Sequence, residues 1–323
     1  MNTKHLAEIL NISIYLKDMK ANKIVHSLQL ITTILCALLS VSAIGQDKIQ
    51  VVTKTIEKQF EYTYGQTIEL KAEKANVMVT GTKGNKVALQ VQFIAKHPSK
   101  AVAERELSYL KFGVNNRDRT LELTNFIAIP KEIKGVESKL EIRFILSVPD
   151  HCNLKIYNRY GRTGLSDVVG DILIDSRFGN VSAGMVGGKV ELITHFGELE
   201  VQQLSGTASI ISQKTKIRLL DVNATLTVES KYGKCYVGLN DGCNKDIKII
   251  SEKAEVRLYT NSFDRFNYDL TGKEVSIPDL NTEVRSRDKK ATFKKEFNKT
   301  NKEIKISTTN YPVIITTNKQ DVL

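Results

Sequence analysis

The stretch Asp171–Val186, DILIDSRFGNVSAGMV, decides the fold of this chain, because its side-chain pattern recurs in the stretch that follows it. Residues 189–204 read KVELITHFGELEVQQL, so that Ile172 corresponds to Val190. A fixed period in this range is typical of stacked-repeat proteins, in which one repeat cannot bury its apolar face alone. The same line of side chains begins again at Leu154, Ala208 and Leu226.

Within each repeat the apolar positions step by two, which predicts β-strands whose alternate side chains face a core. The step lengthens to three at Gly179, and Gly188 marks a second recurring glycine position. Because glycine has no Cβ and readily takes φ > 0, both positions predict corners. We therefore expect an all-β, single-domain β-solenoid, similar to a β-helix. Its 18-residue coils contain two short strands and two corners each, and they stack through parallel strands about 4.8 Å apart.

The pattern divides the chain into regions around a central array. Residues 151–260 are expected to form the β-solenoid repeats, with three residues inserted after Asn240. Residues 46–150 are expected to form an antiparallel β region, in which residues 101–110 form a short helix or continue as strand. Residues 261–323 are expected to form a C-terminal β cap.

Two further segments match the spacing of the coils. Residues 68–79 and residues 304–315 repeat it, which predicts flanking coils or caps of the same body. Residues 285–302 are rich in basic side chains and are expected to form a solvated hairpin or loop.

The N-terminal residues 1–45 are typical of a secretory signal peptide. A basic flank precedes the mostly apolar residues 24–42, and Ala43-Ile44-Gly45 offers small residues for cleavage before Gln46. Met19 would give a signal of ordinary length, so the preceding residues are interpreted as an over-assigned start. The alternative is an uncleaved anchor, because the apolar run is just long enough to span a bilayer. Cleavage is the favoured interpretation, and it predicts an exported protein of the periplasm, outer envelope or extracellular space, with no transmembrane segment.

At this point the chain resembles a known bacterial family. The strand Leu140–Val148 runs into Pro149-Asp150, and glycine-cornered coils follow from Leu154. This arrangement is similar to the "putative adhesin" β-strand-repeat domains, a family of largely unknown function, and the resemblance covers residues 60–320. The family name implies adhesion and brings no agreed ligand or catalytic residue. The family commonly has a small residue before the corner glycine, whereas this chain has Tyr160, Phe178, Phe196 and Tyr232.

The composition favours acidic partners. The chain carries 47 Lys and Arg against 36 Asp and Glu, a formal net charge of +11. Such an excess favours acidic partners such as anionic glycans or lipid headgroups, whereas export makes nucleic acid the least expected partner. The expected partners are therefore an anionic glycan, an envelope component or a protein. After residue 45 the cysteines are Cys152, Cys235 and Cys243, an odd number that does not indicate a disulfide framework. Cys235 is expected to point inward, which disfavours a Cys235–Cys243 link.

No catalytic, cofactor or metal motif is recognisable in the sequence. Residues 184–189 lack the glycine spacing and the Ser or Thr of a phosphate loop. The histidines His97, His151 and His195 have no metal-ligand spacing. We therefore expect a non-enzymatic protein without cofactor or metal, and a polysaccharide-active enzyme is the less favoured alternative. The acidic cluster of the coils, expected to form ladder pairs with basic neighbours, comprises Asp171, Asp175, Glu191, Glu198 and Glu200.

One outward column is a candidate ligand surface. Its members occupy the same position in successive coils and would form a basic stripe that could bind an anionic polysaccharide. The alternative is an ordinary solvated face whose long side chains hinder edge pairing. The members of this stripe are Arg159, Arg177, His195, Gln213 and Lys231.

Two other columns are assigned to the interior. The hydroxyl column Ser176, Thr194, Ser212, Ser230 and Ser251 is expected to hydrogen-bond along the stacking direction. The aromatic column Tyr160, Phe178, Phe196 and Tyr232 would be a sugar-stacking platform if it faced outward. Its even-numbered steps from Ile172 instead predict stacking inside the core.

The favoured function is a non-enzymatic envelope or surface protein that uses its solenoid as a scaffold for adhesion or ligand binding. A self-assembling structural protein, similar to bactofilins, is the alternative of a different class, because open solenoid ends can stack. The oligomeric state is left open by the sequence.

Overall fold

The computed structural model describes residues 48–280, 282–285, 290–297 and 300–322. The chain divides into two compact units, Met1–Ile49 and Gln50–Leu323, and the second contains every strand described here. The expected signal peptide, residues 1–45 with Met19, lies outside the described residues. In the described part, no helix is both long and apolar enough to cross a membrane.

The second unit is all-β, as the alternating pattern predicts, with a single α-helix among the described residues. The first strands are β1 (Gln50–Glu61), β2 (Thr67–Ala72), β3 (Ala75–Thr82), β4 (Lys86–His97), β5 (Leu110–Arg117), β6 (Thr120–Ile127), β7 (Lys139–Pro149) and β8 (Asn153–Asn158), with the helix α2 (Lys100–Leu107) before β5. The central strands are β9 (Thr163–Arg177), β10 (Val181–Leu239) and β11 (Ile247–Tyr259). The last strands are β12 (Asn267–Gly272), β13 (Glu274–Ile277), β14 (Thr282–Arg285), β15 (Ala291–Lys295), β16 (Glu303–Thr309) and β17 (Pro312–Thr316). Three short 3-10 helices cover Phe263–Arg265, Pro278–Leu280 and Lys319–Asp321.

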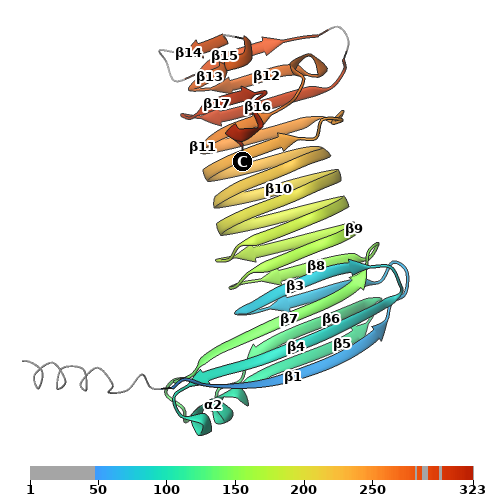
Figure 1. Cartoon of the computed structure of the whole chain (residues 1–323), viewed down its shortest axis with the longest axis vertical. Helices are drawn as coiled ribbons and strands as arrows, with labels where there is room; N and C mark the ends of the chain where they lie inside the picture. The colour runs from blue at the N-terminus through green and yellow to red at the C-terminus, as the bar shows by residue number, and fades with distance from the viewer. Residues whose placement is uncertain (1–47, 281, 286–289, 298–299, 323) are drawn as a thin grey trace, which may run out of the picture. The chain divides into compact units, whose positions relative to one another are not determined.

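The central strands pair in parallel with the offset of the sequence pattern. Ile172 in β9 lies opposite Val190 in β10, and Leu154 in β8 lies opposite Ile172. The long strand β10 passes through several successive turns of the chain (Figure 1). The register between Leu226 and Ile247 contains the three extra residues that follow Asn240. The backbone there closes a turn in which the N–H of Cys243 donates to the carbonyl of Asn240 at 2.9 Å.

The strands of this mixed, 17-stranded sheet follow two rows. Strands β9, β10 and β11 bend at the corners and therefore contribute to both rows. Row A, in pairing order, is β5, β6, β2, β8, β9, β10, β11, β16, β12 and β15. Row B, in pairing order, is β1, β4, β7, β3, β9, β10, β11, β17, β13 and β14.

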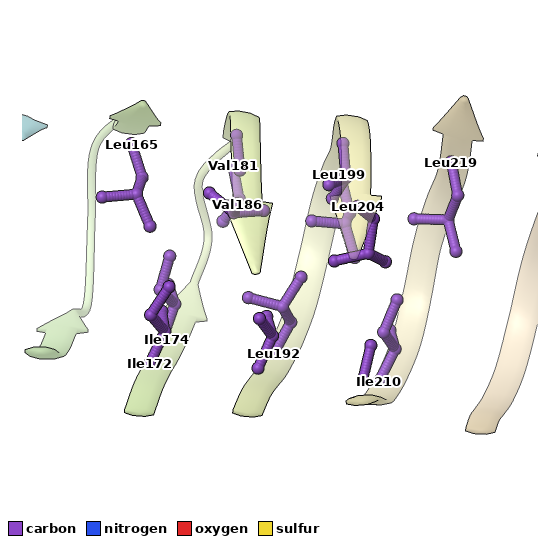
Figure 2. Close-up of a cluster of buried hydrophobic side chains, with 14 of the residues drawn as sticks. Leu165, Ile172, Ile174, Val181, Val186, Leu192, Leu199, Leu204, Ile210 and Leu219 are labelled. Atoms are coloured by element: carbon purple, nitrogen blue, oxygen red, sulfur yellow. The ribbon is translucent and has the colours of Figure 1, made fainter. Parts of the chain in front are cut away.

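Apolar side chains of the two rows meet between them (Figure 2). Leu192 and Ile210 from row A face Leu199 and Leu219 from row B, and each is fully or almost fully buried. Burying such a side chain contributes about 1.5–3 kcal/mol. The buried side chains of both rows belong to one continuous hydrophobic cluster.

The segments that match the coil spacing lie inside the two rows rather than at their ends. In row A, β2 pairs with β8 so that Ile68 lies opposite Leu154, and β16 pairs with β11 so that Ile304 lies opposite Ile247. Strands β4, β7, β5 and β6 lie beyond β2 and β3, and strands β12 to β15 lie beyond β16 and β17. Of the two alternatives for residues 68–79 and 304–315, flanking coils or caps, the cap is therefore wrong, because both segments pair with strands on either side. They flank the central strands with the parallel register of the coils.

The N-terminal region combines antiparallel and parallel pairs. Strand β4 is antiparallel to both β1 and β7, as expected for this region. Strands β3 and β7 are instead parallel, as are β2 and β6. The expectation that residues 46–150 pair only in antiparallel fashion is therefore wrong. Strands β2 and β3 pair in parallel with β8 and β9 of the central array, and they also pair in parallel with β6 and β7. Of the two alternatives for residues 101–110, helix or continued strand, the helix is confirmed, since most of these residues belong to α2.

The corners differ from the expected pair of glycine turns. Left-handed residues fall in three columns, represented by Phe178, Met185 and Gly188, with φ of 54°, 51° and 89°. In this coil and the next, the second corner contains two left-handed positions. At the first corner the bulky residue takes the left-handed conformation, and Gly179 does not.

Gly179 is required for a different reason. A Cβ atom at this position would lie 1.9 Å from the carbonyl oxygen of Gly161 in the preceding coil. Gly197 and Gly233 have the same close approach to a neighbouring carbonyl, at 2.4 and 2.2 Å. The glycine column therefore permits the backbones of adjacent corners to stack.

Candidate functional site

The stripe residues lie at the end of the row A strands. Arg159, Arg177 and Lys231 are exposed, and His195 and Gln213 are half-buried. Arg177 lies opposite His195 across the β9–β10 pair. A ring nitrogen of His195, Nδ1, lies 3.3 Å from Oε1 of Gln213, within hydrogen-bond distance. The 18-residue register therefore brings neighbouring members of the stripe side by side.

The positive charge of the stripe is concentrated at one end. Lys231 lies 3.3 Å from Glu252, which occupies the next position of the column on β11. Arg159 and Arg177 directly follow Asn158 and Ser176, which are partners in the β8–β9 pair. Two guanidinium groups on neighbouring strands repel each other, so this end of the stripe favours an anionic ligand.

The aromatic column faces solvent, so its assignment to the core is wrong. Tyr160, Phe178, Phe196 and Tyr232 are 39%, 52%, 38% and 40% exposed. Three of them take the left-handed conformation, with φ between 54° and 59°. Counting by twos assumes an extended backbone, and a left-handed residue breaks that alternation by turning its side chain outward.

The rings of this column pack against one another and against lysines. Ring centroids of Tyr160 and Phe178 are 5.4 Å apart, and those of Phe178 and Phe196 are 4.9 Å apart, with nearly parallel planes. Lys214 Nζ lies 5.1 Å from the Phe196 centroid, and Lys253 Nζ lies 5.2 Å from that of Tyr232. Because neighbouring side chains occupy these ring faces, the column stabilises the corner and is a poor platform for a sugar.

The hydroxyl column is buried, as expected, but its members do not bond one another. The side-chain oxygens of Ser176, Thr194, Ser212 and Ser230 have no hydrogen-bond partner. Ser251 Oγ donates instead to the carbonyl oxygen of Ala254 at 3.3 Å. These small polar groups fill the inner side of the corner without forming the expected ladder of hydrogen bonds.

A groove of about 460 Å³ opens on row A beside Arg159 and Arg177. Strands β6, β2, β8 and β9, which are consecutive in row A, provide its lining. Its rim includes Phe126, which is 51% exposed. Further lining residues are Lys71, Ala72, Glu73, Thr124, Asn125, Tyr157, Asn158 and Asp175.

The sequence interpretation missed Phe126 and this groove. Phe126 lies on β6, which is distant from β8 in the chain, and it reaches the groove because β2 inserts between them. The available signal was a large apolar residue that remained outside the buried alternation Leu121, Leu123 and Asn125.

The acidic cluster of the coils is divided between the rows. Asp171, Asp175 and Glu191 belong to the strands of row A, and Asp175 lies 3.6 Å from Arg177. Glu198 and Glu200 follow the corner at Phe196 and line a separate groove on row B. The carboxylates therefore do not converge on one site.

The histidines and cysteines are dispersed. Within the described ranges, no group of three or more His, Cys, Asp or Glu side chains could hold a metal ion. His97, His151 and His195 have Ser99, Asp150 and Gln213 as their respective partners. Cys152, Cys235 and Cys243 are free and buried, and burial raises the pKa of the Cys152 and Cys235 thiols to about 12. Such thiols are protonated and poorly nucleophilic at neutral pH.

Comparison with known proteins finds similarity among solved structures. No family model and no curated protein matches the chain. A "putative adhesin" from Bacteroides fragilis NCTC 9343 is 14% identical with a TM-score of 0.36, and the match covers 81% of this chain and 97% of that one. A "putative adhesin" from Parabacteroides merdae ATCC 43184 is 9% identical with a TM-score of 0.36, covering 81% and 96%. A "putative lipid binding protein" from Parabacteroides distasonis ATCC 8503 is 12% identical with a TM-score of 0.31, covering 81% and 96%. Two of these three structures therefore bear the adhesin name, and the third bears a lipid-binding name.

Proposed function

We propose that residues 151–260 form a β-solenoid and that the protein is an exported, non-enzymatic envelope or surface protein. In this proposal row A presents its stripe to an anionic glycan or another acidic component of the envelope. The 18-residue parallel register, the glycine column at the corners and the shared core support the solenoid. The signal-like sequence of residues 1–45 supports export to the periplasm, outer envelope or extracellular space.

The adjacent Arg159 and Arg177 carry the binding part of the proposal. Arg177 ends β9 and Arg159 directly follows the paired strand β8, so their backbones leave the sheet one strand spacing, about 4.8 Å, apart. A rigid pair of guanidinium groups can bind a carboxylate or sulfate without first losing much backbone freedom.

Binding without catalysis is supported by how the carboxylates of row A are paired. Asp175 contacts Arg177 at 3.6 Å, and Asp269 contacts Lys305 at 3.2 Å. A glycoside hydrolase needs two carboxylates on opposite sides of one bond, one of them held as an acid. The first contact joins neighbouring outward residues of β9, and the second joins the paired strands β12 and β16, so both resemble ion pairs that stabilise a sheet.

Self-assembly through the ends of the array is the second class of function and is less favoured. The outermost pairs, β1–β4 and β5–β6 at one end and β13–β14 and β12–β15 at the other, are antiparallel. An open parallel coil therefore does not form either end of the two rows. Electron microscopy tests this alternative, because end-to-end filaments at high protein concentration would support it.

The binding proposal is tested on an array of acidic and neutral glycans. We expect the protein to retain acidic glycans, and Arg177→Ala to reduce binding about tenfold because one charge-assisted contact is lost. Lys234→Ala is the matched control, since this exposed lysine lies past the corner and starts a row B strand. Equal binding by wild type and Arg177→Ala would remove the stripe as the ligand surface. Cell fractionation tests export, and recovery from the cytoplasm alone would contradict it.

A further inference from the structure

The row A groove has a volume of about 460 Å³ and a lining of charged, polar and aromatic side chains. We propose that it binds a uronic acid residue of an acidic polysaccharide, an assignment that rests on the proposed glycan-binding function. The groove lies at the cationic end of the stripe, where Arg159 and Arg177 line it. Its size is within the range of small-molecule sites, roughly 300–1,000 Å³.

The two arginines provide donors for the carboxylate of the sugar. Arg159 has its backbone N–H bound to the carbonyl of Ala72 at 3.2 Å, which holds its strand end against β2. Arg177 contacts Asp175 through Nε at 3.6 Å, and its two terminal nitrogens are not part of that contact. Guanidinium groups bind carboxylates through two parallel hydrogen bonds, which a lysine cannot reproduce.

The same groove contains an acceptor that lacks a donor. Asp175 Oδ1 is buried without a hydrogen-bond partner, and the nearest charged group, Arg177 Nε, lies 3.6 Å away. The Asn158 side chain instead faces the interior of the corner, where it donates to the carbonyl of Ala75 at 3.0 Å and to Thr163 Oγ1 at 3.1 Å. A buried acceptor without a donor is costly, and a sugar hydroxyl would satisfy Asp175.

Aromatic side chains complete the site. Phe126 is half exposed at the rim, and Tyr157 is partly buried in the lining. The C–H face of a pyranose ring packs on such surfaces, so Phe126 gives the groove an apolar wall that a small inorganic ion would not use.

The charges of the lining are mixed, which favours a carboxylated sugar over a uniform polyanion. Lys71, Arg159 and Arg177 are cationic, and Glu73 and Asp175 are anionic. Lys71 already contacts Glu122 and Glu69, and Arg177 contacts Asp175 at 3.6 Å, so Arg159 is the cation of the lining best placed to pair with a ligand.

The groove is held in shape before a ligand binds. The side chain of Asn125 on β6 accepts from the N–H of Glu73 at 3.0 Å and donates to the carbonyl of Glu73 at 2.8 Å. This pair of bonds fixes the end of β6, and therefore the neighbouring Phe126, against the corner after β2. Preorganisation of this kind reduces the entropy lost on binding.

The test is titration calorimetry of the full protein with galacturonate oligomers, at physiological salt. Arg159→Ala and Phe126→Ala should each weaken binding at least tenfold, and Arg159→Lys should weaken it severalfold because the paired hydrogen bonds are lost. Lys231→Ala, at the far end of the stripe and paired with Glu252, should weaken binding less than Arg159→Ala does. Lys234→Ala, past the corner on row B, should bind like the wild type. Thermal melting of each variant checks that it folds.

The controls separate this inference from the function on which it rests. Neutral malto-oligosaccharides should not bind, and inorganic phosphate should compete more weakly than galacturonate. Equal losses in Arg159→Ala and Lys231→Ala would overturn the groove and leave a stripe-wide site. Phosphate that competes as well as galacturonate would reveal a general anion site and also overturn the inference. Failure of every acidic glycan to bind would reject the proposed function itself.

Discussion

At the scale of single residues, the corners decide which side chains reach solvent. Phe178 and Phe196 have φ of 54° and 59°, a conformation that costs a non-glycine residue about 1–2 kcal/mol. Their stacked rings, 4.9 Å apart, offset part of this cost, because such contacts contribute about 0.5–1.5 kcal/mol. The sequence predicts the column and its spacing. Whether these side chains point inward or outward depends on the left-handed backbone, which hydrophobic periodicity does not reveal.

Gly179 provides the sharpest prediction at this scale. Gly179→Ala should destabilise the protein by about 3 kcal/mol, because the new Cβ would lie 1.9 Å from the Gly161 carbonyl oxygen and force the stacked corners apart. The measurement is the free energy of unfolding from denaturant titration. The control is Gly184→Ala in the same coil, where a Cβ has nothing within 4 Å and φ is not positive. This control should change the free energy by less than about 1 kcal/mol. A Gly179→Ala protein as stable as the control would show that the corners do not approach as described.

At the scale of elements, the sequence predicts the coils better than their neighbours. The period identifies residues 68–79 and 304–315 as coil-like, because apolar alternation is a local property. It does not reveal that β2 lies between β6 and β8, since this insertion joins segments that are distant in the chain. The groove is formed by that insertion. Arg159 and Arg177 were therefore predictable as candidates, and their partner Phe126 was not.

The helix α2 makes a testable contact with the loop before β7. Glu106 is fully buried and accepts backbone hydrogen bonds from Glu137 at 3.1 Å and Ser138 at 2.6 Å. Desolvation raises the pKa of this carboxyl, but hydrogen bonds from Ser138, Glu137 and Arg105 outweigh it and lower the pKa to about 2. The ionised carboxylate therefore stabilises the fold above its ordinary pKa of 4.5.

This stabilisation should be lost progressively as the pH falls from 4.5 toward 2. Glu106→Gln should be less stable than wild type at pH 7, and its stability should decline less steeply over that acidic interval. Unfolding free energies measured across the interval test this. Glu104→Gln, an exposed position on the same helix, should retain the wild-type profile. Parallel profiles for wild type and Glu106→Gln would contradict the role assigned to the carboxylate.

At the scale of the whole second unit, the 18-residue offset between paired strands determines where the core, the corners and the stripe lie. Side chains at equivalent positions of successive coils lie on neighbouring strands, so each added coil extends row A by one strand and the stripe by one residue. The candidate site is then the place where this regular row meets the inserted strands β2 and β6. The proposed function is assigned to the outward residues of row A, because the inward columns are occupied by packing.

The most direct test of this account is the thermal unfolding of two deletion variants. Removing residues 188–205 joins Gly187 to Gly206, which occupies the same corner column as Gly188, so both flanking registers survive. Removing only residues 188–196, half of that segment, joins the end of row B in one coil to the first corner of the next. We predict a cooperative transition for the first variant and none for the second. Equal tolerance of the two deletions, or loss of folding in both, would contradict the 18-residue coil.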